Sequence, residues 1–167
     1  VGAGGTANSG TERSYSGEVR ARSETTLGFR IAGKIVERRV DVGQAVKAGQ
    51  VLARLDPADS ALQLAQAEAQ HALAAADLAR YRDLRTKNFV SASALDARET
   101  AFKAAAAQAQ LAKNQAGYTT LAADRNGVVS QVLAEAGQVV GAGQAVFRLA
   151  PDGEREVAIS IPESEIG

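Results

Sequence analysis

The chain has 167 residues, a length that suits one compact domain or two small modules. Its 19 basic and 19 acidic residues give a formal net charge of zero, so it lacks the basic surface expected of a nucleic-acid-binding protein. With no cysteine or methionine and a single histidine, the chain offers few metal ligands and no thiol nucleophile, and we expect no metal and no cofactor. No apolar run approaches the roughly 20 residues that a membrane-spanning helix needs.

The chain begins with small and polar residues, and we expect residues 1–12 to form a flexible leader. Apolar and polar residues then alternate in two places, first between residues 13 and 26 and again from Leu27 to Ile31. Such alternation is typical of strands with one buried face. It predicts two strands in this part of the chain.

An internal repeat follows. Residues 33–56 read GKIVERRVDVGQAVKAGQVLARLD, and residues 127–150 read GVVSQVLAEAGQVVGAGQAVFRLA. Aligned without gaps at an offset of 94, nine of the 24 positions are identical. We interpret the two segments as copies of one β-structure.

Paired glycines mark the turns of each copy, Gly43 and Gly49 in the first and Gly137 and Gly143 in the second. Glycine adopts positive φ without a Cβ clash, so each G-Q-x-V-x-A-G-Q unit is predicted to form a tight hairpin. Neither copy has enough apolar surface for a core of its own. We therefore expect residues 27–56 and 121–154 to form one small sandwich together.

The segment between the copies, residues 57–120, is rich in Ala, Leu and Gln. Its start, with Pro57 between two aspartates, suits the first turn of a helix. Small and apolar residues then recur at steps of four and three, as in a coiled-coil seam. The predicted first seam is Ala58, Leu62, Ala65, Ala69, Ala72, Ala76 and Ala79, and the second, interrupted by Arg98, is Leu95, Phe102, Ala105, Ala109, Ala112 and Ala116. With a turn within residues 86–93, this predicts an antiparallel helical hairpin, and His71 is expected on its surface.

The order of these motifs resembles the periplasmic adaptor, or membrane fusion, proteins of tripartite efflux pumps. Two lipoyl-like half-motifs are split by a helical hairpin that is entered through L-A-R-L-D-P and left through Y-T-T-L-A, and G-V-V and G-Q-x-V-x-x-G-Q follow. The resemblance runs from about Tyr15 to Ile166. It implies an α+β fold: a lipoyl-like β-sandwich, a long coiled-coil hairpin, and strands of an incomplete β-barrel domain at residues 13–26 and 155–167. A complete adaptor would continue beyond Gly167, so the chain looks like a fragment.

The resemblance also implies a site. In these adaptors the hairpin end carries an Arg, a Leu four residues later and a Ser seven after that, which engage the outer-membrane channel, and Arg80, Leu84 and Ser91 have this spacing. From the residues alone, the charges around Arg80 can equally be a solvated helix end, and Ser91 can cap its own helix. Both roles of Ser91 can coexist.

The implied protein is a non-catalytic adaptor in the periplasm, anchored to the inner membrane when full length. Its implied partners are an inner-membrane transporter, most simply of the resistance-nodulation-division (RND) type, a TolC-like outer-membrane channel, and further copies of itself in a hexameric ring. The scarcity of metal ligands favours organic compounds as the exported substrates.

One departure in sequence and two alternatives accompany this resemblance. The family's Ala-Pro pair before the second half-motif is absent, since residues 122–126 contain no proline. A lipoyl or biotinyl carrier domain has the same repeat but needs a lysine on the turn between the half-motifs. Here Asp56 and Pro57 lead into the helix instead, while Lys47 lies inside the first copy with Gly141 as its counterpart. A coiled-coil scaffold without a transport role is the other alternative.

Overall fold

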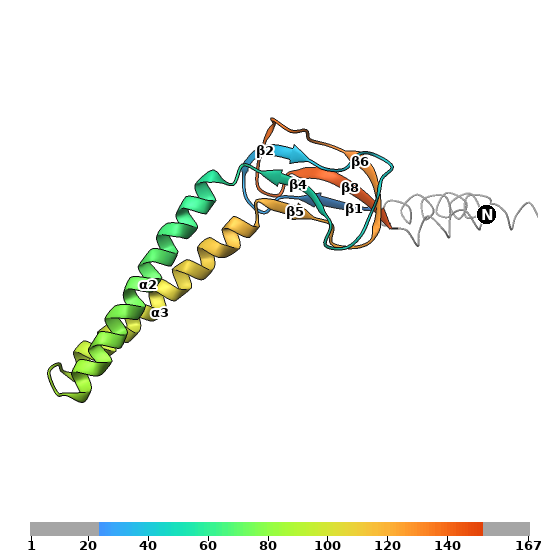
Figure 1. Cartoon of the computed structure of the whole chain (residues 1–167). Coiled ribbons are helices and arrows are strands. Elements are labelled where there is room, and N and C mark those ends of the chain that lie inside the picture. Colours follow the sequence, from blue (N-terminus) through green and yellow to red (C-terminus); the bar gives the residue numbers. More distant parts are fainter. Residues whose placement is uncertain (1–23, 152–167) are drawn as a thin grey trace, which may run out of the picture. The chain divides into compact units, whose positions relative to one another are not determined.

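The structure is a computed structural model that describes residues 24–151. The described chain divides into two compact units: a β-unit on both sides of the insertion, up to Leu55 and from Thr120 onward, and a helical unit, Asp56–Thr119. Figure 1 labels the elements of both units except β3 and β7. The predicted leader and nearly all of the predicted barrel segments lie outside the described residues.

The described part of the β-unit forms two four-stranded sheets, with the strand orders β1-β8-β6-β3 and β5-β4-β2-β7. All neighbouring strands are antiparallel. The strands are β1 (Thr25–Gly28), β2 (Gly33–Arg38), β3 (Ala45–Val46), β4 (Val51–Leu55), β5 (Thr120–Ala122), β6 (Gly127–Val132), β7 (Val139–Val140) and β8 (Ala145–Pro151). The predicted α+β class is confirmed. Thr25 and Thr26, at the end of the first predicted barrel segment, pair with β8 in this unit.

Hydrogen bonds repeat with the sequence. The Gly43 amide donates to the Val129 carbonyl at 2.7 Å, and the Gly137 amide donates to the Ile35 carbonyl at 2.6 Å. The two donors, Gly43 and Gly137, are 94 residues apart, and so are the two acceptors, Ile35 and Val129. This is the offset that relates the sequence copies. The two sheets are therefore copies of one arrangement, each built from both halves of the chain.

The repeat starts before residue 33. The Gly49 amide donates to the Ala123 carbonyl and the Gly143 amide donates to the Phe29 carbonyl, both at 2.8 Å. Phe29 and Ala123 are again 94 residues apart, although the two side chains differ greatly in size. Strands β1 and β5 are therefore also equivalent, and the sequence agrees, because Thr25, Thr26 and Leu27 are identical to the residues 94 positions later, Thr119, Thr120 and Leu121.

The prediction that each G-Q-x-V-x-A-G-Q unit forms its own hairpin is wrong. The short strand in each unit pairs with the other repeat: β3 with β6, and β7 with β2. The predicted positive φ does occur, at Gly43 (90°), Gly49 (87°), Gly137 (94°) and Gly143 (80°). The local sequence thus determines the turn, whereas the partner of the strand that follows is set by packing of the whole unit.

The glutamine after each of these glycines closes the turn. Its backbone amide donates to the carbonyl three residues earlier, and its side-chain Oε1 accepts from the amide of that same residue. The side-chain bonds join Asp41 to Gln44 (3.2 Å), Lys47 to Gln50 (3.1 Å), Glu135 to Gln138 (3.3 Å) and Gly141 to Gln144 (2.9 Å). The repeated glutamines are therefore structural.

Arg38 joins corresponding turns of the two repeats. Its Nη1 donates to Asp41 Oδ1 at 2.5 Å, and its Nε donates to Glu135 Oε1 at 2.7 Å. These hydrogen bonds, that with Asp41 foremost, hold the pKa of Arg38 above its usual value. The guanidinium therefore remains a permanent cation between the two turns.

One hydrophobic core belongs to both repeats. Its largest fully buried side chains are Phe29, Phe147, Ile35, Leu52, Leu55 and Leu149. Complete burial of such a side chain contributes about 1.5–3 kcal/mol. Since the core draws on both halves of the chain, neither repeat can bury it alone.

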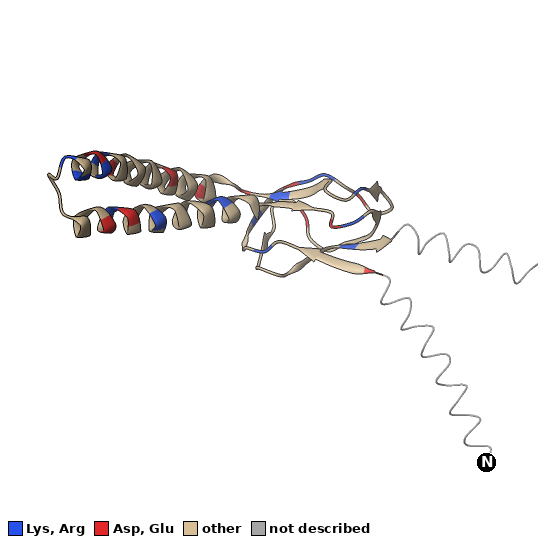
Figure 2. Ribbon diagram, turned by 90° about the horizontal axis from the view of Figure 1, so that it is seen from below, with Lys and Arg blue, Asp and Glu red and all other residues tan. Residues whose placement is uncertain are grey.

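The helical unit consists of α2 (Ala58–Thr86) and α3 (Ala92–Gly117), of 29 and 26 residues. They lie antiparallel and side by side (Figure 1, Figure 2). Pro57 occupies the N-cap position of α2, and Asp56 Oδ1 accepts from the Ala58 amide at 3.0 Å. Neither of these helices has an apolar stretch long enough to cross a bilayer.

The seam predicted for α3 is confirmed, since all its residues, Arg98 included, are buried or half-buried. The seam predicted for α2 is wrong: all seven positions are exposed, and Leu62 retains 70% of its accessible surface. The packed face of α2 is instead Ser60, Leu64, Ala67, His71, Ala74, Leu78 and Tyr81. A search for apolar residues missed this face because polar residues interrupt it. His71 is accordingly half-buried, with its ring centre 5.2 Å from that of Phe102.

Candidate functional site

Charged residues gather at the end of the helical unit where α2 turns into α3 (Figure 2). We call residues 80–91, at this end, the tip. Four basic residues and one acid give the tip a formal charge of +3. They are Arg80, Arg82, Arg85, Lys87 and Asp83.

The basic side chains of the tip have partners within the helical unit. Arg80 pairs with Asp77 one turn earlier. Lys87 Nζ lies 3.1 Å from Asp83 Oδ2, and Arg82 Nη2 lies 4.0 Å from Glu99 Oε1. Exposed pairs of this kind contribute about 0–1 kcal/mol, so each cation can exchange its partner for a binding partner at little cost.

The end of α2 is a Schellman motif. Asn88 adopts the left-handed conformation, with φ 58°. The Phe89 amide donates to the Leu84 carbonyl at 2.9 Å, and the Asn88 amide donates to the Arg85 carbonyl at 3.0 Å. These are the two bonds that define the motif, so the chain leaves α2 in one fixed direction.

Ser91 begins α3 as its N-cap. Its backbone is extended (φ −79°, ψ 161°), and its Oγ accepts from the Ala94 amide at 3.0 Å. The Arg85 Nη1 donates to the Val90 carbonyl at 3.4 Å, which joins the two helix ends across the turn. Only Phe89 and Val90 separate the left-handed Asn88 from the cap, so the turn has few free torsions.

All three residues predicted from the sequence lie at the tip. Arg80 and Leu84 are one helical turn apart on α2, which places them on one face, and Ser91 follows the turn. Arg80 is exposed, Leu84 is half-buried, and the Ser91 hydroxyl already accepts a capping hydrogen bond. A guanidinium can donate two parallel hydrogen bonds to a carboxylate or to carbonyl groups, and a leucine can fill an apolar recess beside it.

Sequence reasoning missed Phe89. Its side chain retains 73% of its accessible surface, more than any other large hydrophobic residue in the described part of the chain. The sequence did carry a signal, because an aromatic residue two positions before a serine N-cap lies in a predicted turn, where polar residues prevail. Phe89 therefore joins the candidate site.

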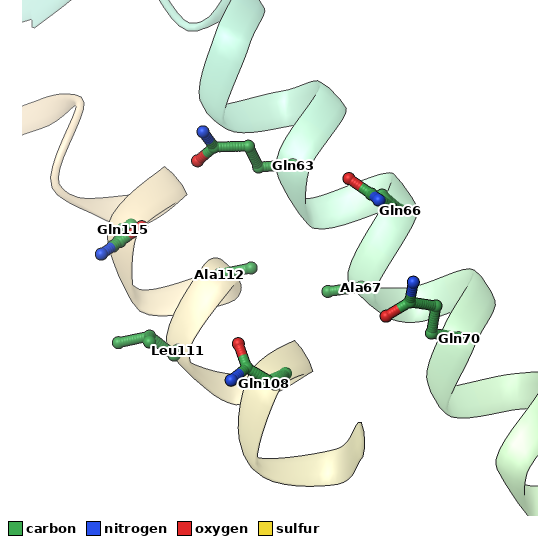
Figure 3. A pocket seen from close by; sticks show the side chains of 8 residues that line it. All are labelled: Gln63, Gln66, Ala67, Gln70, Gln108, Leu111, Ala112 and Gln115. Carbon is green, nitrogen blue, oxygen red and sulfur yellow. The ribbon is translucent and has the colours of Figure 1, made fainter. Parts of the chain in front are cut away.

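A glutamine-lined cleft of about 300 Å³ lies between α2 and α3 (Figure 3). Its lining is Gln63, Gln66, Ala67, Gln70, Gln108, Leu111, Ala112 and Gln115. The opposed alanines leave the space, and the glutamines border it with neutral amides (Figure 3). No titratable or nucleophilic side chain lines this cleft, so it does not provide acid–base or covalent chemistry. Nor do residues 24–151 contain a cluster of three or more His, Cys, Asp or Glu that could hold a metal ion.

Comparison with known proteins gives a family match over most of the chain. Residues 23–150 match the family model described as "RND MFP, barrel-sandwich hybrid domain", where MFP denotes membrane fusion protein. The matched segment contains both sheets, both helices and the tip.

Curated relatives agree with the family match. The chain is 32% identical over 169 aligned positions to the multidrug resistance protein MdtA of Klebsiella pneumoniae, and 30% identical over 166 to that of Escherichia coli strain K12. Each alignment covers 90% of this chain and 40% of the relative. The chain thus spans less than half of the length of these proteins.

Solved structures support the fold. A Bacteroides eggerthii protein assigned to efflux transport matches with a TM-score of 0.75 and 31% identity, over 77% of this chain and 40% of that one. A MacA–MexA chimeric protein that contains the α-hairpin domain of Pseudomonas aeruginosa MexA matches with a TM-score of 0.72 and 27% identity. That alignment covers 77% of this chain and 48% of the chimera.

Proposed function

Because the chain belongs to the RND membrane fusion protein family, we propose that it is the channel-facing part of a periplasmic adaptor for drug efflux. The adaptor links an inner-membrane RND transporter to a TolC-like outer-membrane channel, and the tip docks on the channel. Its role is non-catalytic: energy and substrate selection belong mainly to the transporter. Organic compounds are the exported substrates.

The ordered tip is the observation that carries this proposal. Docking costs less entropy when the binding surface is already fixed in the free protein. Here a Schellman motif and a serine cap fix the turn between the helices, and the tip presents Arg80 and Leu84 on one face beside Ser91. Arg80 exchanges Asp77 for carboxylate or carbonyl oxygens of the channel, and Leu84 fills an apolar recess next to them.

The β-unit has a separate task in this proposal. We assign its two sheets to a lipoyl-like sandwich, which packs beside the same unit of the next copy in a hexameric ring. The ring lies in the periplasm, and an anchor elsewhere in the full-length protein holds it at the inner membrane. The two repeats share one core, so the sandwich presents a single rigid body for this packing.

Photo-crosslinking in cells tests the docking of the tip. We choose p-benzoyl-phenylalanine in place of Ser93, which is exposed in the first turn of α3, so that the Ser91 cap remains intact. In the protein as the cell makes it, this position is expected to form an adduct with the outer-membrane channel. The same probe in place of the exposed Ala107, about 21 Å along α3 at 1.5 Å per residue, is the control and is expected to form none. Equal adducts from both positions, or none from position 93, would contradict the proposal.

A further inference from the structure

The side chain of Phe89 is exposed, whereas its backbone is held in place by a hydrogen bond. Single exposed apolar residues are common on protein surfaces, so its 73% exposure does not by itself indicate a function. The geometry around it does. In a Schellman motif the residue after the left-handed position usually packs against the residue whose carbonyl it binds. These two residues are Phe89 and Leu84.

Most of this ring is uncovered. Leu84 is half-buried, yet Phe89 keeps nearly three quarters of its surface in solvent. The backbone that carries the ring is held in place, because the Phe89 amide donates to the Leu84 carbonyl and the Arg85 guanidinium donates to the next carbonyl, that of Val90. An aromatic side chain has only two torsions, so little further entropy is lost when a partner covers it.

The charges around the ring define the partner. The tip carries a formal charge of +3, in which Arg80, Arg82, Arg85 and Lys87 outnumber Asp83. A complementary surface therefore combines an apolar recess for the ring with carboxylates at its rim. A lipid surface fits less well, because a single ring buries little apolar area.

We propose that Phe89 is the apolar anchor of the tip and inserts into an acid-rimmed apolar recess of the outer-membrane channel. This inference rests on the proposed docking function and adds the residue that carries most of the contact energy. Buried aromatic side chains are the commonest residues of this kind at protein interfaces.

The test combines the photo-crosslinker at position 93 with substitutions at Phe89. Phe89→Ala is expected to lower the yield of the channel adduct at least tenfold, whereas Phe89→Tyr keeps the ring and most of the yield. Leu73→Ala is the matched control: Leu73 is 63% exposed on α2 and lies outside the tip, so its removal should leave the yield unchanged. Thermal unfolding of Phe89→Ala is expected to match that of the parent protein.

Four other outcomes would contradict the role of Phe89 as the anchor. An adduct with the parent tip that persists at full yield in Phe89→Ala overturns the anchor and leaves the docking function standing. No channel adduct from the parent tip overturns both. A lower unfolding temperature in Phe89→Ala makes the ring a structural element, and sedimentation of the parent protein, but not of Phe89→Ala, with phosphatidylglycerol vesicles assigns the ring to a membrane surface instead.

Discussion

The guanidinium carbon of Arg98 lies 4.5 Å from the centre of the Tyr81 ring, and its Nη2 donates a 3.1 Å hydrogen bond to the Tyr81 hydroxyl. Both side chains are half-buried between α2 and α3. A cation in a helix seam normally loses hydration without compensation. Here the face and the hydroxyl of one aromatic residue both compensate it, which explains why Arg98 occupies a seam position where the heptad pattern calls for an apolar residue.

Removal of this pair should destabilise the helical unit. Arg98→Ala is expected to lower the free energy of unfolding by about 1–2 kcal/mol, since a partly buried cation–π contact and a hydrogen bond are both lost. Tyr81→Phe keeps the ring and should lose only about 1 kcal/mol. Chemical denaturation followed by circular dichroism measures both. Arg82→Ala, which removes only an exposed pair with Glu99, should change stability by less than about 0.5 kcal/mol.

Two leucines on α2 test which face of the helix is packed. Leu78 is 5% exposed and Leu73 is 63% exposed. Leu78→Ala should destabilise the helical unit by about 2–3 kcal/mol, whereas Leu73→Ala should stay within about 0.5 kcal/mol. Calorimetric unfolding of the two variants decides the question, and equal losses would show that the packed face has been assigned wrongly.

The positive φ of the turn glycines gives a third prediction. An added Cβ at Gly137 would meet no atom within 4 Å, but the residue has φ 94°, which side chains disfavour. Gly137→Ala should therefore lower stability by about 1–2 kcal/mol through backbone strain alone. Gly141→Ala lies in a similarly open place without a positive φ, and should be neutral or slightly stabilising. A comparable loss in both variants would argue that packing, not backbone conformation, matters in these turns.

Ser91 has a structural role that can be separated from docking. Ser91→Ala removes the oxygen that accepts from the Ala94 amide, and should cost about 1 kcal/mol of stability. Ser91→Asp keeps a capping oxygen and should retain the stability, while its negative charge is expected to weaken binding to an acid-rimmed partner. Unfolding measurements report the first effect, and channel adducts from position 93 report the second. Weak adducts from Ser91→Ala alone would indicate that the hydroxyl itself contacts the channel.

Arg80 and Arg82 form a matched pair, since the side chains of both are 62% exposed. Arg80→Gln should strongly reduce the channel adduct and the export of drugs, because Arg80 is the predicted docking residue. The free energy of unfolding of the Arg80→Gln variant should change by less than about 0.5 kcal/mol, as expected when an exposed pair is lost. Arg82→Gln removes the same charge from outside the predicted Arg-Leu-Ser pattern, and is expected to reduce the adduct and the export less than Arg80→Gln does while leaving the stability unchanged. Equal effects of the two substitutions would reduce the role of Arg80 to that of general positive charge.

The sequence predicted those features that depend on local chemistry. Positive φ at Gly43 and its three equivalents follows from glycine in a repeated turn, and the start of α2 follows from Asp56 and Pro57. The seam of α3 was visible because Leu95 and Phe102 stand out among alanines. By family resemblance, Arg80, Leu84 and Ser91 were predicted to form a docking site at the end of the hairpin. The structure places the three residues at that end, and their docking role stays a prediction.

The remaining features depend on contacts that no local pattern encodes. The pairing of β3 with β6 joins segments of different repeats, so the turn alone could not predict it. Alanines occupy several faces of α2, so their positions do not indicate which face packs against α3. The packed face is the one that carries His71 and Tyr81, which contact Phe102 and Arg98 of α3. The exposure of Phe89 is likewise not predictable from local sequence, because the Schellman motif at this position usually packs such a residue against the helix.

Strands β4 and β5 lie next to each other, with Arg54 opposite Thr120 and a 3.1 Å hydrogen bond between their side chains. The two points where the chain leaves and re-enters the β-unit are therefore fixed as neighbours by the sheet itself. Any insertion whose ends meet at that spacing can occupy this position without altering a strand. If equal numbers of heptads are added to or removed from α2 and α3, the ends of the insertion keep their spacing. The length of the helical unit can therefore vary without a change in the β-unit.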